Sequence, residues 1–210
     1  MLELAFGDTM QGKIRSVAAW VRRKLGAAGH EERVAQIAAT LFDLTSPWHR
    51  LGTAERSLLV LGALVHDVGR AVSKDGHEKL GAHTVLTDER LLLGEAERRR
   101  VAFLTRYHRG PVPEKGAEQI LRDGDDRKTL RRMLAFLRAA DGLDSRWMQS
   151  PQLVFAVRQR QIDVLCYLHS ESDKACLPSL KRKKFRLLEE ELGCRVSVDL
   201  RLNANLSLVA

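Results

Sequence analysis

The sequence predicts a mainly α protein, a helical bundle followed by a small C-terminal α+β appendage. As far as residue 149, apolar side chains recur every three or four residues, which is the spacing of one helix face. After Pro151 the pattern changes to short runs of β-branched and aromatic residues and to strict alternation. We therefore expect a helical domain over residues 1–149 and an α+β tail over residues 150–210.

The expected helices of the first part follow from these stripes. The first covers residues 14–25, with apolar side chains at 14, 17, 18, 21 and 25, and ends near Gly26. Residues 54–68 are apolar on almost every side, as expected for a helix at the centre of the bundle. The others cover residues 31–44, 77–87, 95–107, 115–122 and 126–140.

The tail combines strands with one helix. Residues 153–157 and 162–168 are rich in Val, Ile, Phe and Tyr and are separated by a polar tetrapeptide, which predicts a β-hairpin. Residues 180–192 form a charged helical pattern that stops at Gly193. Residues 195–202 alternate apolar and polar side chains, which is typical of a half-buried strand.

The composition indicates a soluble globular protein of 210 residues, 44% hydrophobic and 30% charged. Three scattered cysteines argue against a disulfide framework and favour a reducing compartment, so we expect a cytoplasmic protein. The longest apolar run, residues 58–65, is too short to cross a membrane, and no secretory signal is visible. A net charge of +8 favours polyanionic partners, although a solvated arginine-rich surface would give the same charge. Homo-oligomerisation is left open.

The chemistry is concentrated around an adjacent His66–Asp67 pair in the most apolar helix of the chain. Burial of two ionisable groups there is costly unless each is paired or bound to a metal. The alternative is a His and an Asp at a helix end, satisfied by backbone groups. His30 opens one helix and Asp141 follows the apolar run of another, so that three helices can bring four ligands to one site.

Imidazole and carboxylate ligands together suit Mn, Fe, Co, Ni or Zn, and Mg remains an alternative. His77 and His108 stand at helix ends and could hold a second ion, with Asp67 as the bridging carboxylate. We therefore expect one or two divalent ions.

The order His30, His66–Asp67, Asp141 resembles the H…HD…D signature of the HD-domain metal-dependent phosphohydrolases. Six segments make the resemblance more specific: 32–35, 41–43, 48–51, 55–59, Arg-Tyr-His-Arg at 106–109 and Leu-Arg-Ala-Ala-Asp-Gly-Leu-Asp at 137–144. They are similar to the C-terminal HD domain of the exopolyphosphatase/guanosine pentaphosphate phosphatase (Ppx/GppA) family. The resemblance is strong over residues 15–150 and weak in the tail.

Two departures from that family bear on function. Its members carry their principal phosphatase site in an actin-like N-terminal half, whereas only 29 residues precede His30 here and none forms a Gly-rich phosphate loop. Polyphosphatase activity of full-length members therefore does not transfer to this chain. Conversely, the His–Asp pair, which some members have lost, is intact, and this favours catalysis within the domain itself.

The resemblance implies a metal-dependent phosphohydrolase in which activated water attacks a phosphate ester, a nucleotide or polyphosphate. Asp67 would orient the water, His108 would serve as a ligand or as an acid on the substrate side, and Arg70 would contact the substrate phosphate. Further basic residues near the ligands are candidates for phosphate binding: Lys74, Arg106, Arg109 and Arg138. Surface or ion-paired arginines are the alternative for each.

Two other functions stay open. A non-catalytic module that binds polyphosphate or a guanosine alarmone would also explain the positive charge. Nucleic-acid binding is disfavoured because aromatic residues make up only 5% and do not interleave with the basic ones. The basic run at 181–184 could attract polyanions, but a solvated helix face explains it as well.

Overall fold

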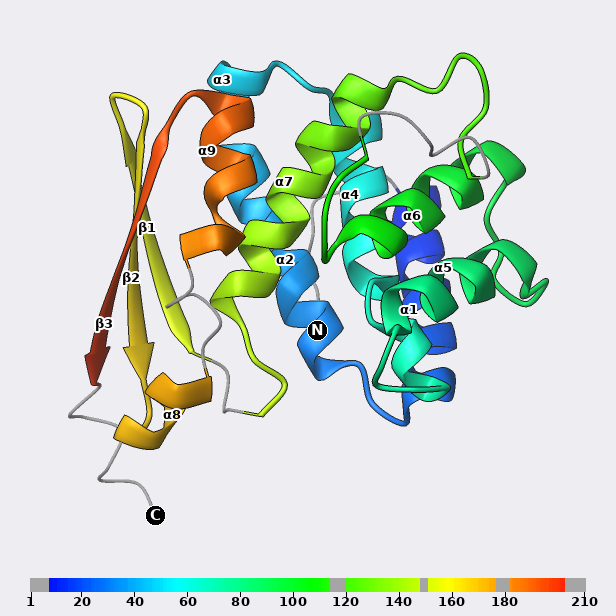
Figure 1. The fold of residues 1–210 in the computed structure, drawn as a ribbon, viewed down its shortest axis with the longest axis horizontal. Coiled ribbons are helices and arrows are strands. Elements are labelled where there is room, and N and C mark those ends of the chain that lie inside the picture. Colours follow the sequence, from blue (N-terminus) through cyan, green and yellow to red (C-terminus); the bar gives the residue numbers. More distant parts are fainter. Residues whose placement is uncertain (1–7, 114–119, 148–150, 177–181, 203–210) are drawn as a thin grey trace.

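The computed structural model describes residues 8–113, 120–147, 151–176 and 182–202, and it is mainly α with a small three-stranded sheet (Figure 1). The bundle helices are α1 (Asp8–Leu25), α2 (Gly29–Leu44), α3 (Ser46–His49), α4 (Thr53–Val65), α5 (His77–Thr87), α6 (Glu95–Tyr107) and α7 (Arg127–Leu143), with a short 3₁₀ helix, η1 (Val68–Ala71), after α4. The sheet stands at one end, and α1, α5 and α6 form the other. The predicted fold class is confirmed.

Helix α4 lies at the centre of the bundle, as its apolar sequence predicts. Its side chains Leu59, Val60, Leu61 and Leu64 are completely buried. The neighbours α1, α2, α6 and α7 surround it. Because every face of α4 meets another helix, the segment that follows it is held firmly at the middle of the protein.

Several elements differ from those predicted. Helix α4 ends at Val65, so that His66 and Asp67 stand just beyond its last turn and not inside the helix. The one-turn helix α3, which has Pro47 in its first turn, was not predicted, nor was α8 (Glu171–Cys176). Of the predicted helix over 115–122, residues 115–119 lie outside the described residues, and 120–122 are a turn and irregular chain. Of the charged helix predicted over 180–192, residues 180–181 lie outside the described residues. The rest contains a 3₁₀ turn, η3 (Arg182–Lys184), followed by α9 (Arg186–Leu192).

The predicted hairpin is present as β1 (Gln152–Arg158) and β2 (Gln161–Leu168), which pair antiparallel. Gln159 and Arg160 connect them with positive φ angles of 45° and 65°, as a type I′ turn requires. Strand β3 (Arg195–Leu202) pairs parallel to β2, so the sheet order is β1-β2-β3. The parallel pairing needs a crossover, which α8, η3 and α9 supply.

The appendage packs on the bundle through α9, which lies between the sheet and α7 (Figure 1). Phe185, Leu187 and Leu188 are buried there and join the hydrophobic core of the bundle, as do Ile162 and Val164 of β2. Strand β1 begins where the sequence pattern changes. The division into a helical domain over residues 1–149 and a tail over residues 150–210 stays a prediction.

No helix in the described ranges combines the length and the apolar character needed to cross a membrane.

Candidate metal centre and cleft

Six side chains that the sequence predicts as metal ligands come together at the middle of the bundle. His30 lies in the first turn of α2, and His66 and Asp67 lie between α4 and η1. His77 is the first residue of α5, His108 directly follows α6, and Asp141 lies in the last turn of α7. Five helices therefore contribute to a single cluster.

The six ligand atoms form two adjoining groups of three, His30–His66–Asp141 and Asp67–His77–His108. In the first group, Asp141 Oδ1 lies 3.6 Å from His30 Nε2 and 3.7 Å from His66 Nε2. In the second group, Asp67 Oδ1 lies 3.0 Å from His77 Nε2 and 3.5 Å from His108 Nε2. Metal–ligand bonds of about 2.1 Å place neighbouring ligand atoms about 3.0–3.4 Å apart. The ligand atoms of both groups would therefore have to move only slightly to bind an ion.

Asp67 connects the two groups. The same Oδ1 atom that faces His77 and His108 lies 3.9 Å from His66 Nε2. The four imidazoles form a continuous row in the order His30, His66, His108, His77, with successive ring centroids 5.3, 5.1 and 5.3 Å apart. A carboxylate between two histidine pairs is an arrangement that can bridge two ions.

Each imidazole has its Nδ1 atom engaged outside the cluster. His66, His77 and His108 donate from Nδ1 to the backbone carbonyls of Ala63, Lys74 and Thr105 at 2.7, 2.8 and 2.7 Å. His30 Nδ1 lies 2.6 Å from Asp144 Oδ2. These contacts favour a proton on Nδ1 and leave the Nε2 atom of every ring directed into the cluster.

A buried nitrogen without a hydrogen-bond partner in the described ranges supports the fit of this cluster to a metal ion. His66 Nε2 is fully buried and has no hydrogen-bond partner among the described residues. Such a group normally costs free energy unless a partner is supplied. A cation between His30, His66 and Asp141 would supply it, so the residues present fit a divalent ion.

The second oxygen of Asp67 is held by two arginines. Arg70 Nε and Arg146 Nη2 donate to Asp67 Oδ2 at 2.8 and 2.9 Å. Arg146 also pairs with Glu31, which is completely buried on α2. Asp67 is therefore fixed so that one oxygen faces the imidazoles and the other faces the guanidinium groups.

The charges of the cluster shift its pKa values. Burial opposes protonation of His30, but hydrogen bonds and charges from Asp141 and Asp144 outweigh it and raise the pKa to about 9. At His108 burial prevails and lowers the pKa. Burial also opposes ionisation of Asp67 and Asp141, yet His66 beside Asp67 and Lys184 beside Asp141 hold both carboxyl pKa values well below their usual range. Both carboxylates are thus ionised and able to act as ligands at neutral pH.

Two glycines let His77 reach Asp67. A Cβ atom on Gly69 would lie 2.0 Å from the carbonyl oxygen of His77 and 2.5 Å from the backbone nitrogen of Gly81. Only glycine allows the backbones of η1 and α5 to approach this closely. This explains how a helix that starts ten residues after Asp67 places its first side chain against that carboxylate.

A cleft of about 580 Å³ opens directly onto the cluster. Its acidic and imidazole lining is Asp67, His77, His108 and Asp141, and its basic lining is Arg70, Arg109, Arg138, Lys183 and Lys184. The basic side chains come from both the bundle and the appendage. The cleft therefore combines a potential metal centre with an anion-attracting wall.

The model of Ppx/GppA phosphatase, domain III, matches residues 15–176, which is more than half of the chain and includes all six ligand residues. The chain belongs to this family. No curated protein gives a match to it. The Ppx/GppA match ends before η3, so Lys183 and Lys184 lie beyond it.

The predicted phosphate-binding residues of this Ppx/GppA domain divide between two hollows. Arg70, Arg109 and Arg138 line the cleft, whereas Lys74 and Arg106 line an adjoining cavity of about 500 Å³ that also contacts Arg109. The guanidinium of Arg138 donates to the carbonyl oxygens of Tyr107 and Gly110. Arg138 thus fixes the chain on both sides of His108.

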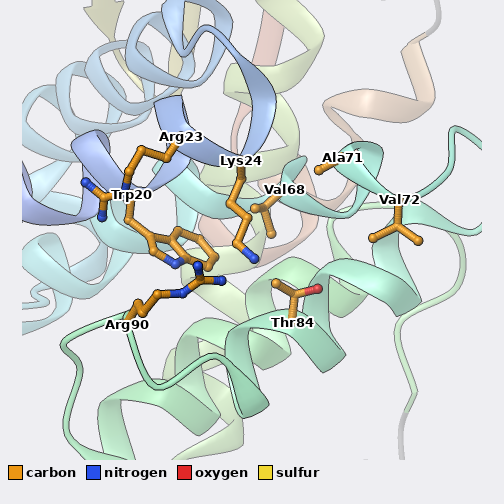
Figure 2. Close-up of a pocket in the computed structure, with 8 residues that line it drawn as sticks. All are labelled: Trp20, Arg23, Lys24, Val68, Ala71, Val72, Thr84 and Arg90. Carbon is orange, nitrogen blue, oxygen red and sulfur yellow. The ribbon is translucent and has the colours of Figure 1, made fainter.

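A third cavity, of about 380 Å³, lies between α1, η1 and α5 (Figure 2). Lys24 and Arg90 point toward Trp20 there. Asp88 pairs with Lys24 and Arg90 at 2.7 and 2.9 Å and accepts a hydrogen bond from Trp20. Lys24 and Arg90 are therefore already partnered by an acidic group within this cavity.

Four residues of the site were not predicted from the sequence: Glu31, Asp144, Arg146 and Lys184. Asp144 lies three residues after Asp141, just beyond the end of α7, and this short spacing of two aspartates could have indicated it. Glu31 and Arg146 gave no signal, because their pairing depends on tertiary structure. Lys184 belongs to a basic run that a solvated helix face explains equally well.

Proposed function

We propose that this Ppx/GppA domain is an HD-type, metal-dependent phosphohydrolase that holds two divalent ions. The observation that carries the proposal is the convergence of four Nε2 atoms and two ionised carboxylates beside a basic cleft. A regulatory relic would not need every imidazole to be turned by an Nδ1 contact toward the same point.

The ligands divide between the two ions. His30, His66, Asp67 and Asp141 would hold the first ion, and Asp67, His77 and His108 the second. When bound, the ions supply Lewis acidity to a phosphoryl oxygen and lower the pKa of water. The mixed imidazole and carboxylate set suits Mn, Fe, Co, Ni or Zn, with Mg as the alternative.

His108 is proposed as a ligand in preference to a general acid. Burial lowers its pKa, so its imidazole is neutral at pH 7 and has a free lone pair at Nε2. Asp67 is still proposed to orient the attacking water. Arg70 and Arg146 fix its Oδ2 atom, while Oδ1 faces the reacting centre. Arg70, which also lines the cleft, would then contact the substrate phosphate.

The substrate class is a phosphate ester, a nucleotide or polyphosphate. Basic groups in the cleft outnumber its carboxylates, as an anionic substrate requires. Lys74 and Arg106 in the adjoining cavity would bind more distant phosphates of a longer substrate. The cytoplasmic location stays a prediction. It agrees with the buried thiols of Cys166 and Cys194, whose pKa values burial raises to about 11.

Elemental analysis of the purified protein, combined with hydrolysis assays over a panel of phosphoesters and polyphosphate, tests the proposal. We expect stoichiometric divalent metal and turnover in the wild type, and loss of both in His66→Ala and Asp67→Ala with helical circular dichroism retained. His83→Ala, on α5 but outside the cluster, is the matched control and keeps both. A wild type that binds polyphosphate or an alarmone without metal or turnover would establish the regulatory alternative instead. Retained metal in both ligand variants would refute the metal site.

A further inference from the structure

The C-terminal appendage contributes one wall of the cleft. Lys183 and Lys184 of η3 line it together with ligands of the bundle. Lys184 contacts a ligand directly, because its Nζ atom donates to Oδ2 of Asp141. The other oxygen of this carboxylate faces His30 and His66. An ammonium group of the appendage therefore lies next to the first proposed metal position.

The approach of Lys184 depends on a glycine in α7. A Cβ atom on Gly142 would lie 2.9 Å from Lys184 Cβ and 3.4 Å from its Cγ. Glycine within a helix weakens it relative to alanine. Gly142 nevertheless follows Asp141 directly, and its bare surface is what admits the η3 turn. The close approach of Lys184 to α7 therefore depends on the absence of a side chain at Gly142.

The other basic groups of the cleft are partly engaged elsewhere. Arg138 is bound to backbone carbonyls, and Arg70 is bound to Asp67. Lys184 is paired with a carboxylate whose charge a metal ion would also neutralise. If a metal ion neutralises the Asp141 carboxylate, the ammonium group of Lys184 is left as a hydrogen-bond donor at the cleft surface. A phosphoryl group bound beside the metal would lie next to it.

We propose that Lys184 binds the substrate by donating a hydrogen bond to a non-bridging oxygen of the reacting phosphoryl group. The appendage thereby completes the substrate site and favours a terminal, doubly charged phosphoryl group over a singly charged phosphodiester. Five basic side chains against two carboxylates in the cleft lining support this preference for high charge. The inference rests on the proposed function, because it needs the metal centre beside Asp141.

The test uses manganese-loaded full-length protein and three variants. Lys184→Met removes the donor, Lys184→Arg keeps the charge, and Gly142→Ala displaces η3 without removing any charge. Arg186→Gln is the matched control, because Arg186 is an exposed residue of the same appendage that pairs with Glu190. It removes one positive charge from the appendage at a residue that is not part of the cleft lining.

Three measurements are made on each protein: inorganic phosphate affinity by calorimetry, kcat/KM for p-nitrophenyl phosphate and for its bis-ester, and bound manganese. We expect Lys184→Met to weaken phosphate binding and kcat/KM for the monoester by roughly 10- to 100-fold, the loss of one charge-assisted hydrogen bond. The diester should lose much less. Gly142→Ala should show the same pattern, Lys184→Arg should recover most of the loss, and the control should match the wild type. Manganese content should stay unchanged throughout.

Wild-type phosphate affinity in Lys184→Met would overturn the inference while leaving the proposed function intact. A wild type that binds neither manganese nor phosphate would overturn the proposed function first, and the inference with it. If the variants fail to fold, acylation of lysines in the wild type decides the matter. Phosphate should protect Lys184 from an amine-reactive ester in the manganese-loaded protein, and unprotected acylation would refute its role.

Discussion

His30 and Asp144 are joined across 114 residues of sequence by a contact of 2.6 Å between Nδ1 and a carboxylate oxygen. Asp144 is completely buried, and Arg33 donates two further hydrogen bonds to it at 2.8 and 3.0 Å. The carboxylate therefore fixes the orientation of the His30 ring and increases the basicity of its Nε2 atom.

Asp144→Asn should weaken binding of the first ion by about 10- to 100-fold, the usual effect of losing a group that orients a ligand. Titration calorimetry with Mn²⁺ measures it. Asp43→Asn is the control and should have no effect, because it removes an exposed α2 carboxylate that pairs with Arg56 of α4. Unchanged affinity in Asp144→Asn would show that His30 does not depend on this contact.

The number of ions separates the two ligand groups. Wild-type protein should saturate at two ions per chain, whereas His77→Ala and His108→Ala should each saturate at one, because the group of His30, His66 and Asp141 is left intact. Native mass spectrometry with increasing Mn²⁺ reads the count directly. Saturation of the wild type at one ion would leave a mononuclear site, with His77 and His108 as hydrogen-bond donors.

The stability of the metal-free protein should depend on His30. Its pKa is raised to about 9 in the folded protein, from 6.5 in the unfolded chain, so the folded state holds its proton more tightly. This contribution is complete below pH 6.5 and is lost as the pH rises through about 9. Melting temperatures in EDTA should fall over that interval more steeply for the wild type than for His30→Gln.

Metal should reverse this trend, because an ion competes with the His30 proton and its affinity rises with pH. Equal slopes for the wild type and His30→Gln in EDTA would contradict the assigned pKa shift.

Gly69→Ala should damage both the fold and the second ligand group. Its Cβ would lie 2.0 Å from the backbone of His77, so η1 and α5 must separate. We expect a loss of at least about 2 kcal/mol of stability, or roughly 4–8 °C in melting temperature, and loss of one ion. Gly12→Ala, in open space on α1, should instead be neutral or stabilising. A Gly69→Ala protein with wild-type melting and metal content would contradict the close packing.

The helices of the bundle could be predicted from their periodicity because each buries one face in the hydrophobic core. The end of α4 could not, because the helical pattern of the sequence continues to Val68 while the chain turns at His66 to place Gly69 against α5. The break between η3 and α9 was missed for a similar reason. Lys184 turns toward Asp141 through a contact that no local pattern contains.

The six predicted ligands are brought together because each stands at or near the end of a helix, and these helix ends meet at the middle of the bundle. The groups that orient them were harder to predict. Glu31 and Arg146 pair across the fold, and neither differs from an ordinary surface charge in sequence. Of the arginines proposed for phosphate binding, Arg138 also has a structural role that its position beside an apolar run did not indicate.

The distance in sequence between His30 and Asp144 has a consequence for synthesis of the protein. The ribosome releases the chain from its N-terminus, so α2, with His30, is free long before α7 has been made. An ion caught early by His66 and Asp67 would exchange freely, since Asp141 and the group that orients His30 are still missing. Tight retention of the first ion would begin only when α7 docks, which would make it a marker of a chain finished through α7 and a means to separate such molecules from truncated ones.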